Sequence, residues 1–154
     1  MQKLKLGIIS LGRIGKVHLE SLVTRIPAAQ VVAASDHSGK NIAFAKSMGI
    51  QNIFQSANEV IHPEIEAVVI CSPSNFHFKH IVASANAGKN IFCEKPLDLS
   101  IEKIEEIDRI VKKQGVKLQV GFNQRFDANF SKVRAMVSNG NIGEPNILKI
   151  TSRD

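Results

Sequence analysis

The first fifteen residues constrain the fold of this chain more than any other segment. An apolar run, Lys5–Ile9, leads into a short segment containing Gly12 and Gly15, and an amphipathic stretch begins at Arg13. A strand, a glycine-containing turn and a helix in this order are typical of a dinucleotide-binding unit. In such a unit the free N–H groups and the positive dipole end of the helix N-terminus receive the phosphates. The segment therefore predicts a β–α–β unit with an anion-binding turn.

The residues of this turn have separate predicted tasks. Gly12 lets the backbone approach a pyrophosphate, and Gly15 lets the helix pack closely on the strand. Ser10 stands where the fingerprint has its first glycine, although serine does not adopt a positive φ freely. We expect a dinucleotide to contact the turn at Ser10, Gly12, Arg13, Ile14 and Gly15.

Asp36 predicts the kind of dinucleotide. It ends the next apolar run, 21 residues after Gly15, close to the spacing of about 20 at which an acidic residue binds ribose hydroxyls. A carboxylate repels a 2′-phosphate and so favours NAD over NADP. The residues that follow are His37, Ser38 and Gly39, without the immediate arginine or lysine usual for NADP. The alternative is that Asp36 only caps a turn.

The composition indicates a globular chain. Of its 154 residues, 44% are hydrophobic and 22% are charged, and no apolar run approaches the about 20 residues that span a bilayer. Cys71 and Cys93 each end an apolar run, so we expect buried thiols in a reducing cytoplasm, with neither a disulfide nor a metal site. The net charge of +6 comes from scattered lysines and arginines, and Trp and Tyr are absent. A nucleic-acid partner is therefore not expected.

Strand-like and helix-like segments alternate along the chain. The predicted strands are Lys5–Ile9, Gln30–Ser35, Asn52–Phe54, Ala67–Cys71, Asn90–Cys93, Lys117–Gly121 and Asn146–Thr151. The predicted helices are Arg13–Arg25, Ser38–Met48, Ala57–Ile61, Phe78–Ala87, Ser100–Lys113 (with Ser100 as N-cap) and Ala128–Asn139. Nearly uninterrupted apolar strands between helices predict an α/β fold, a doubly wound parallel sheet of the Rossmann type in three αβα layers. We expect residues 1–145 to form this single domain.

The last nine residues, 146–154, are expected to begin a second structure. Asn146–Thr151 looks like a strand with no sheet after it, so we expect the chain to be part of a longer protein. Apolar side chains in the last helix and this strand are then uncovered. Such surfaces and unpaired strand edges associate readily, so a homo-oligomer is expected.

Further motifs follow the glycine turn in a fixed order. Ser72–His77 follows the fourth predicted strand, Glu94–Pro96 the fifth and Gly121–Phe126 the sixth, and Gly140–Pro145 precedes the last. Together these motifs resemble the glucose–fructose oxidoreductase/inositol dehydrogenase family over essentially the whole chain. The closing residues, 149–154, look most like its inositol 2-dehydrogenase branch.

The resemblance implies an NAD-dependent oxidoreductase that transfers a hydride from the CH–OH group of a polyol or sugar to nicotinamide. In the family, the catalytic histidine and aspartate lie in a C-terminal domain, and no residue here matches that pair. The chain alone is therefore expected to bind cofactor without turning over substrate. A non-catalytic dinucleotide-sensing or partner-binding module is the alternative.

The resemblance also implies roles for residues beyond the turn. Lys95 is the candidate catalytic and substrate-binding residue, because the family's lysine at this position points at substrate and cofactor; a surface lysine is the alternative. Glu94 is expected to orient Lys95 or touch the nicotinamide ribose, or to be a plain rim carboxylate. Asn123 and Arg125 are expected to bind substrate, with an Arg125–Asp127 ion pair as the alternative.

Residues at the end of the fourth strand are expected near the nicotinamide half of the cofactor, because the strand order reverses there. The sequence favours a packing or helix-start role over general-base catalysis for the histidine of this group. The candidate cofactor contacts in this region are Ser72, Pro73, Ser74, His77 and Glu94.

Overall fold

A computed structural model gives the structure of residues 2–151. The chain divides into two compact units, the sheet unit (Met1–Gly121) and the C-terminal unit (Phe122–Asp154). The domain boundary expected near residue 145 stays a prediction. Met1 and residues 152–154, the end of the expected second structure, lie outside the described residues.

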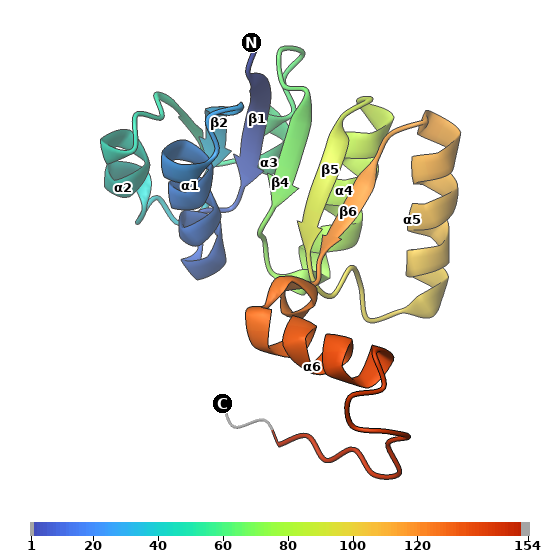
Figure 1. Cartoon of the computed structure of the whole chain (residues 1–154). Helices are drawn as coiled ribbons and strands as arrows, with labels where there is room; N and C mark the ends of the chain where they lie inside the picture. The colour runs from blue at the N-terminus through green and yellow to red at the C-terminus, as the bar shows by residue number, and fades with distance from the viewer. Residues whose placement is uncertain (1, 152–154) are drawn as a thin grey trace. The chain divides into compact units, whose positions relative to one another are not determined.

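The sheet unit is built on six parallel strands in the order β3-β2-β1-β4-β5-β6 (Figure 1). The strands are β1 (Leu4–Ile9), β2 (Ala29–Ser35), β3 (Asn52–Phe54), β4 (Ala67–Ile70), β5 (Asn90–Glu94) and β6 (Leu118–Gly121). The order reverses between β1 and β4. The predicted doubly wound parallel sheet is therefore confirmed.

Helices cover both faces of this sheet (Figure 1). They are α1 (Arg13–Arg25), α2 (Ile42–Ser47), α3 (Ala57–Val60), α4 (His77–Asn86) and α5 (Ile101–Gln114). Ile8 packs with side chains of α1 and α2, whereas its neighbour Ile9 packs with side chains of α3, α4 and α5. Because successive strand side chains point to opposite faces, one strand supplies two cores and three layers result.

The helix ends follow local capping chemistry. Ser100 caps α5, since its hydroxyl accepts from the N–H of Lys103 at 3.3 Å. The prediction that the second helix begins at Ser38 was wrong, because α2 begins at Ile42. The Asp36 carboxylate accepts from the N–H groups of Ser38 and Asn41, and these contacts hold the intervening segment as a turn.

The C-terminal unit contains a 3₁₀ turn, η2 (Asn123–Phe126), and one helix, α6 (Ala128–Ser138). The Asp127 carboxylate caps α6 by accepting from two backbone N–H groups. The predicted strand at Asn146–Thr151 was wrong, because this run is irregular in the structure. A strand needs a neighbour to receive its backbone hydrogen bonds, and none pairs with this run among the described residues.

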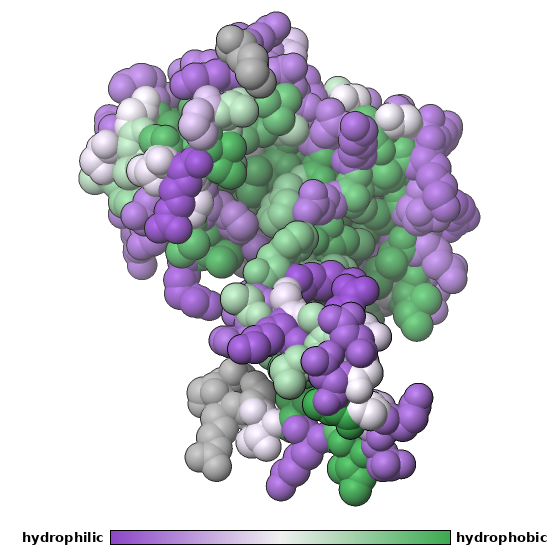
Figure 2. Space-filling model, viewed as in Figure 1, coloured by the Kyte–Doolittle hydropathy of each residue, from purple (hydrophilic) through white to green (hydrophobic). Residues whose placement is uncertain are grey.

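Apolar side chains are exposed on the C-terminal unit, and Figure 2 shows several of them on its visible face. They include Phe126, Phe130, Val133, Ile147 and Leu148. In residues 2–151, no helix combines the length and apolar character needed to cross a membrane.

Candidate functional site

A cavity of about 790 Å³ opens at the carboxyl ends of the strands in the sheet unit. This edge cavity is lined by residues that follow β1, β2 and β4, among them Ser10, Asp36 and Ser72. It therefore lies where the strand order reverses, the usual ligand position in an open parallel sheet. Its volume falls within the range of about 300–1,000 Å³ that small-molecule sites occupy.

Ser10 adopts the conformation that glycine usually supplies at this turn. Its φ is +76°, in the left-handed region. Its backbone N–H donates to the Ser35 hydroxyl at 3.1 Å, which ties the turn after β1 to the end of β2. Serine therefore stands here in a backbone conformation that favours glycine.

The two glycines of the turn have different surroundings. A Cβ on Gly15 would lie 2.0 Å from the carbonyl oxygen of Ser10, so the close approach of helix and strand requires glycine. A Cβ on Gly12 would meet no atom within 4 Å. Gly12 lines the edge cavity, so this open space is where a ligand can approach the backbone.

The N-terminus of α1 offers its amide groups to that space. No side chain caps the helix, and its first turn carries no acidic residue. The first N–H groups of a helix have no partner within the helix, so those of Arg13, Ile14 and Gly15 are oriented for an anion. A dinucleotide pyrophosphate fits this arrangement of open space and donors.

Asp36 is buried and organises the turn that follows β2. Its Oδ1 accepts from the N–H and hydroxyl of Ser38 at 3.3 and 2.9 Å, and its Oδ2 accepts from the N–H of Asn41 at 2.7 Å. Asp36 therefore caps the turn, as the alternative interpretation expected. An ionised carboxylate has about four acceptor positions, so these contacts leave room for a ribose hydroxyl.

Residues that the sequence analysis did not single out form another part of the cavity wall. The rings of Phe76 and His80 stack with centroids 6.1 Å apart and an interplanar angle of 19°, and both line the cavity. Burial, followed by the charge of Lys79, lowers the pKa of His80. Nδ1 of His80 lies 3.0 Å from the Ser72 hydroxyl. The spacing of four residues along a helix was the available signal.

The four candidate cofactor contacts after β4 differ in their position relative to the edge cavity. Ser72 and Pro73 line the edge cavity, whereas Ser74 and His77 are not among its lining residues. His77 begins α4 and is only 1% exposed. Its ring lies between the carbonyl oxygens of Ser72 and Pro96, at 2.7 and 2.6 Å.

Glu94 and Lys95 follow one another at the carboxyl end of β5. Nε2 of His18, on α1, lies 2.8 Å from Oε1 of Glu94. Lys95 is exposed, and its peptide bond to Pro96 is cis. The His18 contact was not predicted, because nothing in the local sequence links a helix residue to a strand end so far along the chain.

Asn123 and Arg125 belong to the C-terminal unit, in η2. Arg125 lines a separate hollow there with Arg134. Asp127, the alternative partner of Arg125, instead accepts from the N–H groups of Asn129 and Phe130 at 2.9 and 3.1 Å.

The cysteines are buried free thiols. Burial raises the pKa of Cys93 to about 12, with a further contribution from the charge of Glu94. Burial likewise raises the pKa of Cys71. Within residues 2–151, no group of three or more His, Cys, Asp or Glu side chains is placed to hold a metal ion.

Comparison with known proteins places this geometry in a family. A family model described as "Oxidoreductase family, NAD-binding Rossmann fold" matches residues 4–122. The chain is 46% identical over 150 residues to the uncharacterized oxidoreductase YrbE of Bacillus subtilis, covering 96% of this chain and 44% of that protein. It is 40% identical over 153 residues to myo-inositol 2-dehydrogenase of Thermotoga maritima, covering 98% of this chain and 46% of that protein.

A solved structure is also similar. The crystal structure of scyllo-inositol dehydrogenase from Lactobacillus casei with bound NAD(H) and scyllo-inositol matches with a TM-score of 0.86 and 36% sequence identity. The match covers 93% of this chain and 43% of that one. The chain thus spans less than half the length of these relatives. Since the family model covers residues 4–122 of 154, the chain belongs to the glucose–fructose oxidoreductase/inositol dehydrogenase family of oxidoreductases with an NAD-binding Rossmann fold.

Proposed function

We propose that the sheet unit binds NAD in preference to NADP, as the cofactor domain of a dehydrogenase acting on a polyol or sugar of the inositol type. The observation that carries this proposal is the edge cavity, which is lined by both Gly12 and Asp36. It combines open space at Gly12, at the uncapped N-terminus of α1, with a buried carboxylate.

The preference for NAD follows from the burial and the negative charge of the Asp36 carboxylate. The carboxylate is 5% exposed, so water screens its charge poorly. The 2′-phosphate of NADP would be brought against this carboxylate, and like charges placed together oppose binding strongly. A ribose 2′-hydroxyl would instead donate to the remaining acceptor position.

The substrate class is supported by the relatives, two of which are named as dehydrogenases of myo-inositol and scyllo-inositol. Bound nicotinamide supplies a hydride acceptor. Lys95 would bind and polarise the substrate hydroxyl, and Glu94 would hold the nicotinamide ribose or orient Lys95. Asn123 and Arg125 are proposed to contact the substrate. The 154-residue chain by itself is proposed to bind cofactor without turnover.

The test is calorimetric titration of the purified chain with NAD and with NADP. NAD should bind more tightly. In an Asp36→Asn variant, the ratio of NAD to NADP affinity should fall by about tenfold or more, because the repulsion is removed. The matched control is Asp108→Asn, which changes a carboxylate with 58% side-chain exposure. Equal affinity for the two nucleotides, or no binding of either, contradicts the proposal.

A second inference concerns the C-terminal unit, whose exposed apolar side chains were described above. Exposed apolar patches of this kind mark interaction surfaces. We infer that a second copy of the chain covers them, which gives a homo-oligomer. Sedimentation velocity at increasing concentration should show a rising mass, and a constant monomer mass contradicts the inference.

A further inference from the structure

The ring of His77 connects two loops at the carboxyl edge of the sheet. Ser72 lies in the loop after β4 and Pro96 in the loop after β5, and these two strands are neighbours. Nε2 lies 2.7 Å from the Ser72 carbonyl oxygen, and Nδ1 lies 2.6 Å from the Pro96 carbonyl oxygen. The two contacts join the wall of the edge cavity to the segment that carries Lys95.

These contacts are well protected from water, because His77 is 1% exposed. A carbonyl oxygen only accepts, so each contact depends on a proton on the facing ring nitrogen. A neutral ring donates to one carbonyl, and a protonated ring donates to both. Removing the ring leaves at least one of the two carbonyl groups without its donor, in a place where water cannot easily replace it, which is costly.

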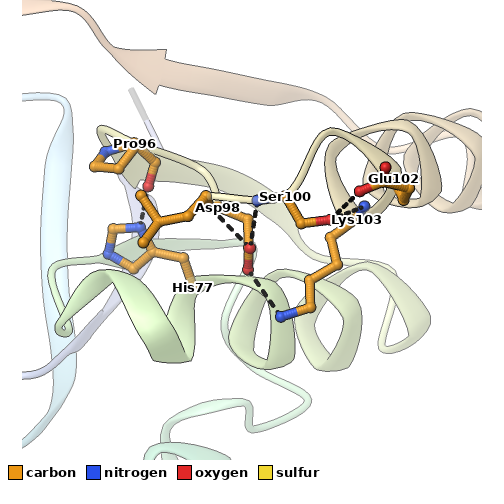
Figure 3. A network of polar contacts seen from close by, with 7 residues as sticks. His77, Pro96, Asp98, Ser100, Glu102 and Lys103 are labelled. Carbon is orange, nitrogen blue, oxygen red and sulfur yellow. Dashed lines mark hydrogen bonds and ion pairs between the residues drawn. The ribbon is translucent and has the colours of Figure 1, made fainter.

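The segment after Pro96 has a second anchor (Figure 3). The Asp98 carboxylate accepts from the N–H groups of Leu99 and Ser100 at 2.8 and 3.0 Å, and it also contacts the Lys103 ammonium at 3.5 Å. Figure 3 shows the His77 ring in contact with the Pro96 carbonyl, and Asp98 two positions further along the same loop as Pro96. The backbone beside Lys95 is therefore held at Pro96 from α4 and at Asp98 from the start of α5.

We propose that His77 is a positioning residue for Lys95. Its ring holds the Pro96 carbonyl, and thereby sets the direction in which the preceding lysine leaves the edge of the sheet. The contact with Ser72 fixes the position of that lysine relative to the wall of the edge cavity. The functional importance of this direction rests on the proposed function. The two contacts of the His77 ring with Ser72 and Pro96, here called the clamp, do not depend on it.

Two substitutions separate the arms of the clamp. The amide nitrogen of an asparagine side chain can take the place of Nδ1, so His77→Asn keeps a donor for Pro96. The longer glutamine reaches the place of Nε2, so His77→Gln keeps a donor for Ser72 and loses the one for Pro96. His62→Gln is the control, because His62 is exposed.

The readouts need no nucleotide. Lysines are labelled by reductive ¹³C-methylation, and the Lys95 signal is assigned with a Lys95→Arg variant. Hydrogen exchange of the peptide covering residues 92–99 is measured beside it. In His77→Gln we expect a displaced Lys95 signal and exchange faster by about tenfold, the effect of one lost hydrogen bond. His77→Asn keeps the donor for Pro96 and should disturb both readouts less than His77→Gln does, and His62→Gln should match the unsubstituted chain.

The proposal is overturned if His77→Gln leaves both readouts unchanged, or if the Asn and Gln variants disturb them equally. A purely structural role predicts the second outcome, because both variants lose the same ring. NAD titration is performed separately. If the clamp behaves as expected but the unsubstituted chain does not bind NAD, the proposed function fails while the assignment of His77 stands.

Discussion

Nε2 of His18 lies 2.8 Å from Oε1 of Glu94, which joins α1, the helix after the glycine turn, to the carboxyl end of β5. The ring of His18 also meets the ring of Phe92 edge-on, with centroids 5.2 Å apart. Both contacts restrict the imidazole, and an ionised carboxylate can only accept. His18 therefore donates to Glu94 and orients the residue that precedes Lys95.

The contact between His18 and Glu94 predicts that a His18 variant binds the nicotinamide half of the cofactor less well and leaves binding of the adenine half unchanged. A His18→Leu variant should bind NADH several-fold more weakly, because Glu94, which we propose to hold the nicotinamide ribose, loses its donor. Its affinity for ADP, which lacks both the nicotinamide and the ribose that carries it, should be less affected. Calorimetry with the two ligands measures the difference. His18→Gln restores a donor and should recover binding; an equal loss for both ligands would argue against this role for Glu94.

The two glycines of the turn should respond differently to alanine. Gly12→Ala has room for its Cβ, so the free energy of unfolding should fall by less than about 1 kcal/mol, while NAD binding should weaken strongly. Gly15→Ala places a Cβ 2.0 Å from the Ser10 carbonyl oxygen, so stability should fall by about 1–3 kcal/mol. Urea unfolding and calorimetry report the two effects. Undiminished NAD binding by Gly12→Ala would show that no pyrophosphate lies over this residue.

Replacement of Ser10 by glycine should stabilise the fold. The Ser10 φ of +76° is unfavourable for any residue with a Cβ. Ser10→Gly should raise the free energy of unfolding by about 0.5–1 kcal/mol, which is the relieved strain less the entropy that glycine adds to the unfolded chain. Its N–H can still donate to Ser35. Ser10→Ala retains the Cβ and should bring no gain in urea unfolding, so equal stabilisation by both variants would refute the explanation.

Asp98 makes stability depend on pH. The N–H of Ser100, helped by that of Leu99 and by the Lys103 ammonium, holds the pKa of Asp98 below its usual range. A carboxyl group with a lower pKa in the folded state stabilises the fold above its unfolded pKa of about 4, and this contribution is lost as the pH falls through the folded value. Urea unfolding of Asp98→Asn should therefore lose less stability below about pH 4 than the unsubstituted chain. An unchanged acid dependence would exclude Asp98 as a contributor.

The strands and helices of the sheet unit were predictable because their signals are local. Arg13–Arg25 is helical over its predicted range, since the glycine turn and the amphipathic spacing both lie within it. The predicted start of the second helix was wrong, although its cause is also local. Asp36, two and five positions before them, accepts from the amides of Ser38 and Asn41 and holds them in a turn.

The doubly wound sheet, the position of the glycine turn and the acidic residue at the end of β2 follow from the amino-acid sequence alone, because hydrophobic period and glycine placement act over short stretches of chain. Which side chains meet depends on the tertiary structure. His18 and Glu94 are 76 positions apart, and His77 lies 19 positions from Pro96. Such contacts depend on the order of the strands and the packing of helices on them. The same dependence left Asn146–Thr151 without strand structure, because an extended run becomes a strand only when another strand accepts and donates its backbone hydrogen bonds.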